Sequence, residues 1–272
     1  MINNKLSCVI CGKNNLELIN TVVKKPTVEV EYNIPPHQYL RHIYQCLNCG
    51  VYYNHHSLLD KNFYKSAYNA SIEEGIIYKR FERIINLDSK NSDNKNRVKR
   101  IDNFFQRTKN TNSKVLDIGS GTCVFLYEMK KLGFKTFCID PDLSAINHAE
   151  NVVKVNGAYR GDIMNINIKH RFDLISFNKV LEHIKNPVEH LKKSRDYLKN
   201  KGILYIELPE GDRINKDNII NSRSEFAVEH YTIYNEKSIN KLLSVSGFEL
   251  LKSEIITDPS GKYTIYAFAK RL

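Results

Sequence analysis

The chain of 272 residues lacks an apolar run long enough to cross a membrane, and its first residues lack the apolar core of a secretory signal peptide. These absences argue against membrane-spanning and secreted proteins, so a cytoplasmic location is expected. No internal repeat is visible either. What is present, 42% hydrophobic and 26% charged residues, is typical of a globular protein with one large α/β domain and a small accessory module.

Basic residues outnumber acidic ones, but no segment concentrates them. The formal net charge of +11 comes from scattered lysines, and the densest stretch, residues 90–100, reads as a solvated linker and helix start. Charge of this kind speaks to association and not to fold. The scattered distribution is better explained by a Lys- and Asn-rich composition than by a nucleic-acid-binding surface. Binding of an anionic acceptor or of RNA remains an alternative.

Four of the six cysteines lie in two Cys-x-x-Cys-Gly motifs near the start of the chain: Cys8 with Cys11, and Cys46 with Cys49. Two such motifs 34 residues apart supply four thiolates for a structural, tetrahedral Zn²⁺ site. A disulfide framework and a redox dithiol are the alternatives, and they fit less well because nothing indicates secretion. Cys123 and Cys138 are expected to be packing residues.

Three regions follow one another: a zinc-ribbon-like module at 1–56, a polar helical linker and cofactor cover at 57–110, and an α/β domain at 111–272. The polar segment 86–96 suits a loop between helices. From residue 113 onward, apolar strands alternate with amphipathic helices. Strands are expected at 114–118, 135–139, 157–160, 172–177, 202–208, 248–256 and 263–269, and helices at 124–132, 144–151, 188–198 and 236–246. This order predicts a doubly wound, mostly parallel, Rossmann-like sheet of seven strands whose last two strands form an antiparallel hairpin.

The stretch 114–126 reads as a strand, a glycine turn and a helix, which is the first βα turn of a nucleotide-binding sheet. Asp117 precedes Gly119 and Gly121, and Asp140 ends the next strand 19 positions after Gly121. A leading acid with a second acid at this distance points to S-adenosylmethionine instead of a dinucleotide. Cys123 stands where a third glycine is common.

Residues 113–272 resemble the class I S-adenosylmethionine-dependent methyltransferases, including the stretches 180–187 and 198–209. The resemblance implies S-adenosylmethionine as cofactor and S-adenosylhomocysteine as product. Asp117 would bind the amino group, Asp140 the ribose hydroxyls and Asp162 the adenine amino group, with Ile163 packed on the ring. Further cofactor contacts are expected from Gly119, Gly121, Thr122, Pro141 and Asn178, and from Tyr64 and Tyr68 in the preceding helix.

A zinc ribbon ahead of such a domain is similar to two groups: sugar and polysaccharide methyltransferases, and a ribosomal RNA guanine methyltransferase. The stretches 44–53, 63–68, 229–234 and 242–248 are closer to the first group. The chain is too short for the extra C-terminal domain of the sugar C-methyltransferases, which favours a hydroxyl or similar acceptor.

A hydroxyl acceptor benefits from a base that removes its proton, and histidine titrates close to working pH. His230, flanked by Glu229 and Tyr231, is the first candidate, following a polar insertion at 210–224 that could form an acceptor lid. His183, just after the fourth strand, is the second. Both can equally be structural. The adjacent His55 and His56 are interpreted as a solvated surface pair, not as metal ligands.

The sequence therefore predicts an O-methyltransferase acting on a sugar, a nucleotide-sugar or a phosphoryl-type substituent in bacterial surface-polysaccharide synthesis. An RNA methyltransferase is the first alternative, although the chain lacks an Asn-Pro-Pro-Tyr motif after the fourth strand. A non-catalytic cofactor-binding protein is the second. The acidic and glycine positions argue for cofactor binding and cannot by themselves show turnover.

Overall fold

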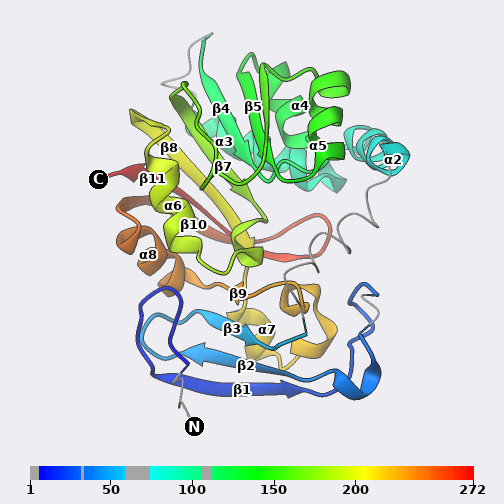
Figure 1. Ribbon diagram of the computed structural model, residues 1–272, viewed down its shortest axis with the longest axis vertical. Coiled ribbons are helices and arrows are strands. Elements are labelled where there is room, and N and C mark those ends of the chain that lie inside the picture. Colours follow the sequence, from blue (N-terminus) through cyan, green and yellow to red (C-terminus); the bar gives the residue numbers. More distant parts are fainter. Residues whose placement is uncertain (1–5, 32–33, 59–73, 106–111) are drawn as a thin grey trace.

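The computed structural model describes residues 6–31, 34–58, 74–105 and 112–272, and these form two sheets, one above the other in Figure 1. The upper sheet has seven strands in the order β10-β11-β8-β7-β4-β5-β6, and the lower one has four in the order β1-β2-β3-β9. The strands of the upper sheet are β4 (Lys114–Ile118), β5 (Lys135–Asp140), β6 (Gly157–Arg160), β7 (Phe172–Asn178), β8 (Leu198–Pro209), β10 (Phe248–Thr257) and β11 (Tyr263–Arg271).

Helices cover both faces of the seven-stranded sheet. They are α2 (Glu74–Ile85), α3 (Asp93–Phe105), α4 (Val124–Lys131), α5 (Leu143–His148, continued by a π-helical turn at Ala149–Val153), α6 (Pro187–Arg195) and α8 (Glu236–Val245). Alternate side chains of each strand point to opposite faces. On β4, Val115 packs with residues of α3 and α4, whereas Leu116 packs with residues of α6 and α8.

The predicted topology of this sheet is confirmed. Strands β4, β5, β6, β7 and β8 run parallel to one another, and β11 is antiparallel to both β8 and β10, so the last two strands form the expected hairpin at the edge. Some boundaries differ from expectation: β8 begins at Leu198 instead of 202, and α6 ends at Arg195 instead of 198. The loop expected to reach residue 96 ends earlier because α3 begins at Asp93.

The four-stranded sheet combines segments from distant parts of the chain: β1 (Leu16–Val22), β2 (Arg41–Cys46), β3 (Tyr52–His55) and β9 (Thr232–Ile233). Short β9 pairs antiparallel with β3, so that Tyr52 lies opposite Ile233. The N-terminal module is thus completed by a strand that the sequence assigns to the α/β domain.

The polar insertion after β8, which the sequence suggested as an acceptor lid, is folded against the N-terminal module. It contains α7 (Asp212–Lys216) and two 3-10 turns, and it packs on the four-stranded sheet. Ile214 and Phe226 are fully buried there, in a small core with Tyr52 and Ile233. Its apolar side chains are spaced irregularly among polar ones, which hid this packing from the sequence. In the described parts of the chain, no helix is both long and apolar enough to cross a membrane.

Candidate active site

The glycine turn between β4 and α4 lies where the carboxyl ends of β4 and β5 meet. Gly119 has a φ of 74°, and a Cβ there would lie 2.6 Å from a methyl carbon of Val180, so a larger residue is excluded twice over. The Gly119 N–H donates to the carbonyl of Ile139 at 2.8 Å. The backbone of the turn is therefore fixed against the neighbouring strand and against Val180.

Asp140 is anchored by this turn. Its carboxylate accepts hydrogen bonds from the backbone N–H groups of Gly121, at 2.8 Å, and Asp142, at 2.9 Å. Burial raises the pKa of Asp140 to about 6, although both backbone donors act in the opposite direction. A carboxylate oriented in this way has lone pairs left for hydroxyl donors. That is the role expected for a ribose-binding acid.

Asp117 has a different setting from the one expected. One of its oxygens accepts from Ser176 Oγ at 2.7 Å and from Asn178 Nδ2 at 2.8 Å, so the side chain ties β4 to the end of β7. It is only 2% exposed, and burial raises its pKa to about 7. Ser120 Oγ and Asn178 Oδ1 are buried polar atoms with no hydrogen-bond partner in the described part of the chain. Such atoms are normally satisfied, so they fit a polar ligand at this edge.

Other expected cofactor residues are placed on the same turns. Cys123, in the position of the missing glycine, adopts a left-handed φ of 60°, which explains why glycine is common there. The backbone of Thr122 bonds to the ring of His148, and Pro141 is exposed at the start of the turn after β5. Tyr64 and Tyr68 lie outside the described residues.

Asp162 carries a partner that the sequence analysis missed. His190 Nε2, from α6, donates to its carboxylate at 3.2 Å, and this bond lowers the pKa of Asp162. The backbone N–H of Met164 donates at 2.9 Å. Ile163 is buried in the core. Because His190 lies on a helix 28 residues later, no local pattern could have indicated the pair.

His183 and His230 come together from different segments. His183 ends a 3-10 turn at Leu181–His183, and its ring lies 4.7 Å from that of His230, edge to face. Each Nδ1 is bonded to a backbone carbonyl: His183 to Glu229 at 3.2 Å, and His230 to Glu225 at 2.8 Å. An Nδ1–H that donates to a carbonyl leaves Nε2 as the basic nitrogen.

Both rings are neutral near pH 7. Burial lowers the pKa of His183 to about 3 and that of His230 to about 4. The nearby carboxyl group of Glu182 is 1% exposed, and burial raises its pKa to about 7. Ligand atoms of Glu182, His183 and His230 lie within 4.8 Å of one another, as in a possible metal site. The electrostatic setting is mixed, because Lys262 adds positive potential at both rings whereas Glu229 acts in the opposite direction on His183.

Tyr231, the third candidate catalytic residue, leads from His230 into β9. Its ring stacks on His56, and Lys185 Nζ lies 5.2 Å from its centre. His56 is therefore not part of a solvated pair, as the sequence suggested. Its Nε2 donates to the carbonyl of Val228 at 2.9 Å, and burial lowers its pKa to about 4. The interpretation of two adjacent histidines as a solvated pair was wrong for His56, because only His55 is exposed.

The four N-terminal cysteines converge. Sγ of Cys8 lies 3.4 Å from that of Cys49, and Sγ of Cys11 lies 3.6 Å from that of Cys46, and none is in a disulfide. The two motifs fold alike, since Gly12 N–H donates to the Cys8 carbonyl at 2.8 Å and Gly50 N–H to the Cys46 carbonyl at 2.7 Å. Two matching turns that present four sulfur atoms at these distances are compatible with a zinc site.

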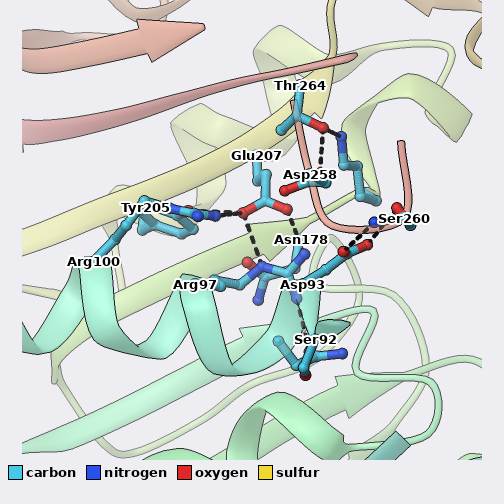
Figure 2. A network of polar contacts seen from close by, with 12 residues as sticks. Ser92, Asp93, Arg97, Arg100, Asn178, Tyr205, Glu207, Asp258, Ser260 and Thr264 are labelled. Atoms are coloured by element: carbon cyan, nitrogen blue, oxygen red, sulfur yellow. Dashed lines mark hydrogen bonds and ion pairs between the residues drawn. The ribbon is translucent and has the colours of Figure 1, made fainter. Parts of the chain in front are cut away.

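An ion-pair network at the end of β8 was also missed (Figure 2). Glu207 is fully buried, and it accepts from Arg97 through two nitrogens, from Arg100 at 2.8 Å and from Tyr205 at 2.8 Å. The arginine guanidinium groups hold the pKa of Glu207 well below its usual range. The basic stretch 90–100 is therefore not a solvated linker. A helical spacing of three residues was the available signal, because it places Arg97 and Arg100 on one face of α3.

Comparison with known proteins agrees with this geometry. A family model described as a methyltransferase domain matches residues 88–253. The chain belongs to this methyltransferase family. No curated protein sequence matches it.

Solved structures share its fold. Magnesium protoporphyrin IX methyltransferase from Synechocystis PCC 6803, with bound S-adenosylhomocysteine, aligns with a TM-score of 0.59 at 15% identity, covering 78% of this chain and 100% of that one. An S-adenosylmethionine-dependent methyltransferase from Clostridium acetobutylicum ATCC 824 has a TM-score of 0.52 at 18% identity, covering 75% and 99%. A glycopeptide N-methyltransferase complexed with sinefungin has a TM-score of 0.51 at 12% identity, covering 65% and 85%. These likenesses show a shared methyltransferase fold.

Proposed function

We propose that this methyltransferase transfers the methyl group to an oxygen of a sugar, a nucleotide-sugar or a phosphoryl-type substituent during synthesis of a bacterial surface polysaccharide, in the cytoplasm. The observation that carries the proposal is the neutral histidine pair His183 and His230 beyond the carboxyl ends of β7 and β8. The resemblance of the stretch 229–234 and of the cysteine motifs to sugar methyltransferases supports the acceptor class.

The cofactor fits the carboxyl edge described above. Asp140 would hold the ribose hydroxyls, and Ser120 and Asn178 offer the unsatisfied polar atoms. Asp117 acts through Asn178, which it orients. S-adenosylmethionine, when bound, supplies an electrophilic methyl group. The chain contributes by holding the acceptor in line with it, and orientation of this kind can lower a barrier by about 7–11 kcal/mol.

His230 is the proposed general base. Its Nδ1–H is fixed on the Glu225 carbonyl, so Nε2 can accept the proton of an acceptor hydroxyl as the new bond forms. Its lowered pKa keeps the nitrogen unprotonated at pH 7 and makes it a weaker base than a histidine whose pKa lies near 7. His183, in edge contact, would orient the ring. The four cysteines are proposed to hold a structural Zn²⁺ that takes no part in the reaction.

The test uses methyl-labelled S-adenosylmethionine with an extract of the source cells, separated into polysaccharide, nucleotide-sugar, RNA and protein fractions. Label in a carbohydrate fraction that falls about 10²- to 10⁴-fold in a His230→Phe variant supports the proposal. Label in RNA, or full activity of that variant, contradicts it. Lys237→Ala, at an exposed lysine whose Nζ donates to the Leu47 carbonyl at 3.2 Å, serves as the control.

A further inference from the structure

Three side chains of the N-terminal sheet donate hydrogen bonds to three consecutive carbonyls just before His230. Arg41 Nη1 donates to Phe226 at 2.6 Å, Asn54 Nδ2 to Ala227 at 3.1 Å and His56 Nε2 to Val228 at 2.9 Å. We propose that Arg41, Asn54 and His56 are positioning residues for His230, so that the cysteine-bearing module is a working part of the acceptor site. The proposal rests on the proposed function of His230.

Asn54 holds the loop on both sides of His230. Besides its side-chain bond to Ala227, its backbone N–H donates to the carbonyl of Tyr231 at 3.0 Å. Asn54 is 1% exposed, so water cannot replace these bonds without rearrangement. The base is therefore clamped between two contacts from a single residue of β3.

The side chain of Arg41 is itself held in place by an ion pair. It is buried on β2, and its guanidinium pairs with Glu29 at 2.5 Å, whose other oxygen accepts from Tyr39. A buried ion pair is a costly way to gain stability alone, and its better-attested use is to fix one geometry. Here the ion pair fixes the direction in which Arg41 Nη1 donates to the Phe226 carbonyl.

The α/β domain also forms a hydrogen bond to the loop that carries His230. The Tyr231 N–H donates to the carbonyl of Glu182 at 2.7 Å, next to His183. The His183–His230 ring distance of 4.7 Å therefore depends on both sheets at once. A displacement of about 1 Å at a reacting group costs about 100-fold in rate, so release of one grip is enough to impair transfer.

Matched substitutions separate positioning from folding. Asn54→Asp keeps the shape but turns the donor facing Ala227 into an acceptor. His56→Phe removes the donor while keeping a ring against Tyr231, and His56→Gln restores a donor at a similar reach. His55→Phe, at the exposed neighbouring position, is the control.

Each variant is measured in three ways: S-adenosylhomocysteine affinity by calorimetry, the ¹⁵N signals of the His230 ring in histidine-labelled protein, and the rate of label transfer to the accepting fraction. We expect Asn54→Asp and His56→Phe to shift the His230 signals and to lower transfer about 100-fold, with cofactor affinity within twofold of wild type. His56→Gln should recover most of the rate, and His55→Phe should match wild type throughout.

Unchanged His230 signals in Asn54→Asp and His56→Phe would overturn the proposal, and so would wild-type transfer in both. This readout needs no acceptor. The signals could instead shift as expected while the wild-type protein and the His230→Phe variant label the same fractions equally. In that case the positioning of His230 is supported and the proposed function is contradicted.

Discussion

The proposed cofactor side and the proposed acceptor side of this methyltransferase are assembled in opposite ways. The cofactor side uses Asp117, Gly119, Asp140 and Asn178, all within one stretch of strand ends on a single sheet. The acceptor side joins Arg41 of β2, Asn54 of β3 and His56, which follows β3, to a loop 172 to 185 positions later in the chain. Carboxyl ends of parallel strands converge in any sheet of this topology, whereas the second arrangement depends on how two sheets meet.

Burial also acts on the two sides with opposite results. On the cofactor side it raises the pKa of Asp117 to about 7 and of Asp140 to about 6. On the acceptor side it lowers the pKa of His183 to about 3 and of His230 to about 4. In each case the low-dielectric interior disfavours the charged form. The acids are thus poised to gain charge when a cofactor donates to them, while the histidines are held as neutral acceptors of a proton.

The largest effect is expected when the proposed zinc is removed, because this should unfold the acceptor side and leave the cofactor side folded. Cys46→Ser should unfold the four-stranded sheet locally, because structural zinc contributes about 10–16 kcal/mol of apparent binding free energy in zinc-finger peptides. Hydrogen exchange should then show loss of protection in β2 and β3 but not in β4 and β7. Cys138→Ser, at a buried cysteine of β5, is the control. Joint loss of both sheets would show that they are a single cooperative unit.

A smaller effect is expected within the α/β domain. Arg97→Met leaves Glu207 with one fewer buried cation and should lower the free energy of unfolding by about 3–5 kcal/mol. Urea denaturation measures this loss, with Lys99→Met, at an exposed position of the same helix, as the control. Equal costs for the two variants would contradict the role given to the Glu207 network.

Asp140→Ala should weaken S-adenosylhomocysteine binding about 10- to 100-fold, because hydrogen bonds to a charged group contribute about 1.5–3 kcal/mol. Calorimetric titration measures the change. Asp142→Ala removes the N-cap of α5, where Asp142 accepts from the Ser144 N–H at 3.1 Å, and should lower stability without this loss of affinity. Matching losses of affinity would place the ribose elsewhere.

The smallest effect is the pH dependence of binding. Hydroxyl donors favour the charged form of Asp140, whose pKa is raised to about 6, so affinity should fall up to about tenfold for each pH unit below 6. The sign for stability is opposite. The contribution of Asp140 to the stability of the cofactor-free protein should fall as pH rises from about 4 to about 6, because the folded state holds this proton more tightly than the unfolded chain, whereas the buried histidines contribute in the opposite direction. A pH series of titrations checks the first trend, and Asp140→Asn should flatten it.

The sequence was informative where structure is local. All seven strands of the large sheet and the four helices between them could be located from apolar periodicity, because each element is set by its own residues. The cysteine cluster could be found for a related reason, since each motif forms one turn. Asp117 was recognised as a site residue, but its bonds to Ser176 and Asn178 depend on the pairing of β4 with β7.

What stayed hidden depends on contacts between distant segments. His56 and the arginines of α3 were read as solvated because charge and polarity in a sequence do not reveal a buried partner, and those partners are Val228 and Glu207. Strand β9 consists of two residues, too few to show a period. The sequence therefore identified the candidate histidines of the acceptor side, but it could not predict which distant residues hold them in place.

Titration of S-adenosylhomocysteine into the Cys46→Ser protein tests the separation of the two sides most directly. We expect one binding site with a dissociation constant within about twofold of wild type, while transfer of the methyl group is lost. A tenfold or greater loss of affinity would contradict it, and would show that the cofactor site depends on the N-terminal sheet as much as the acceptor site does.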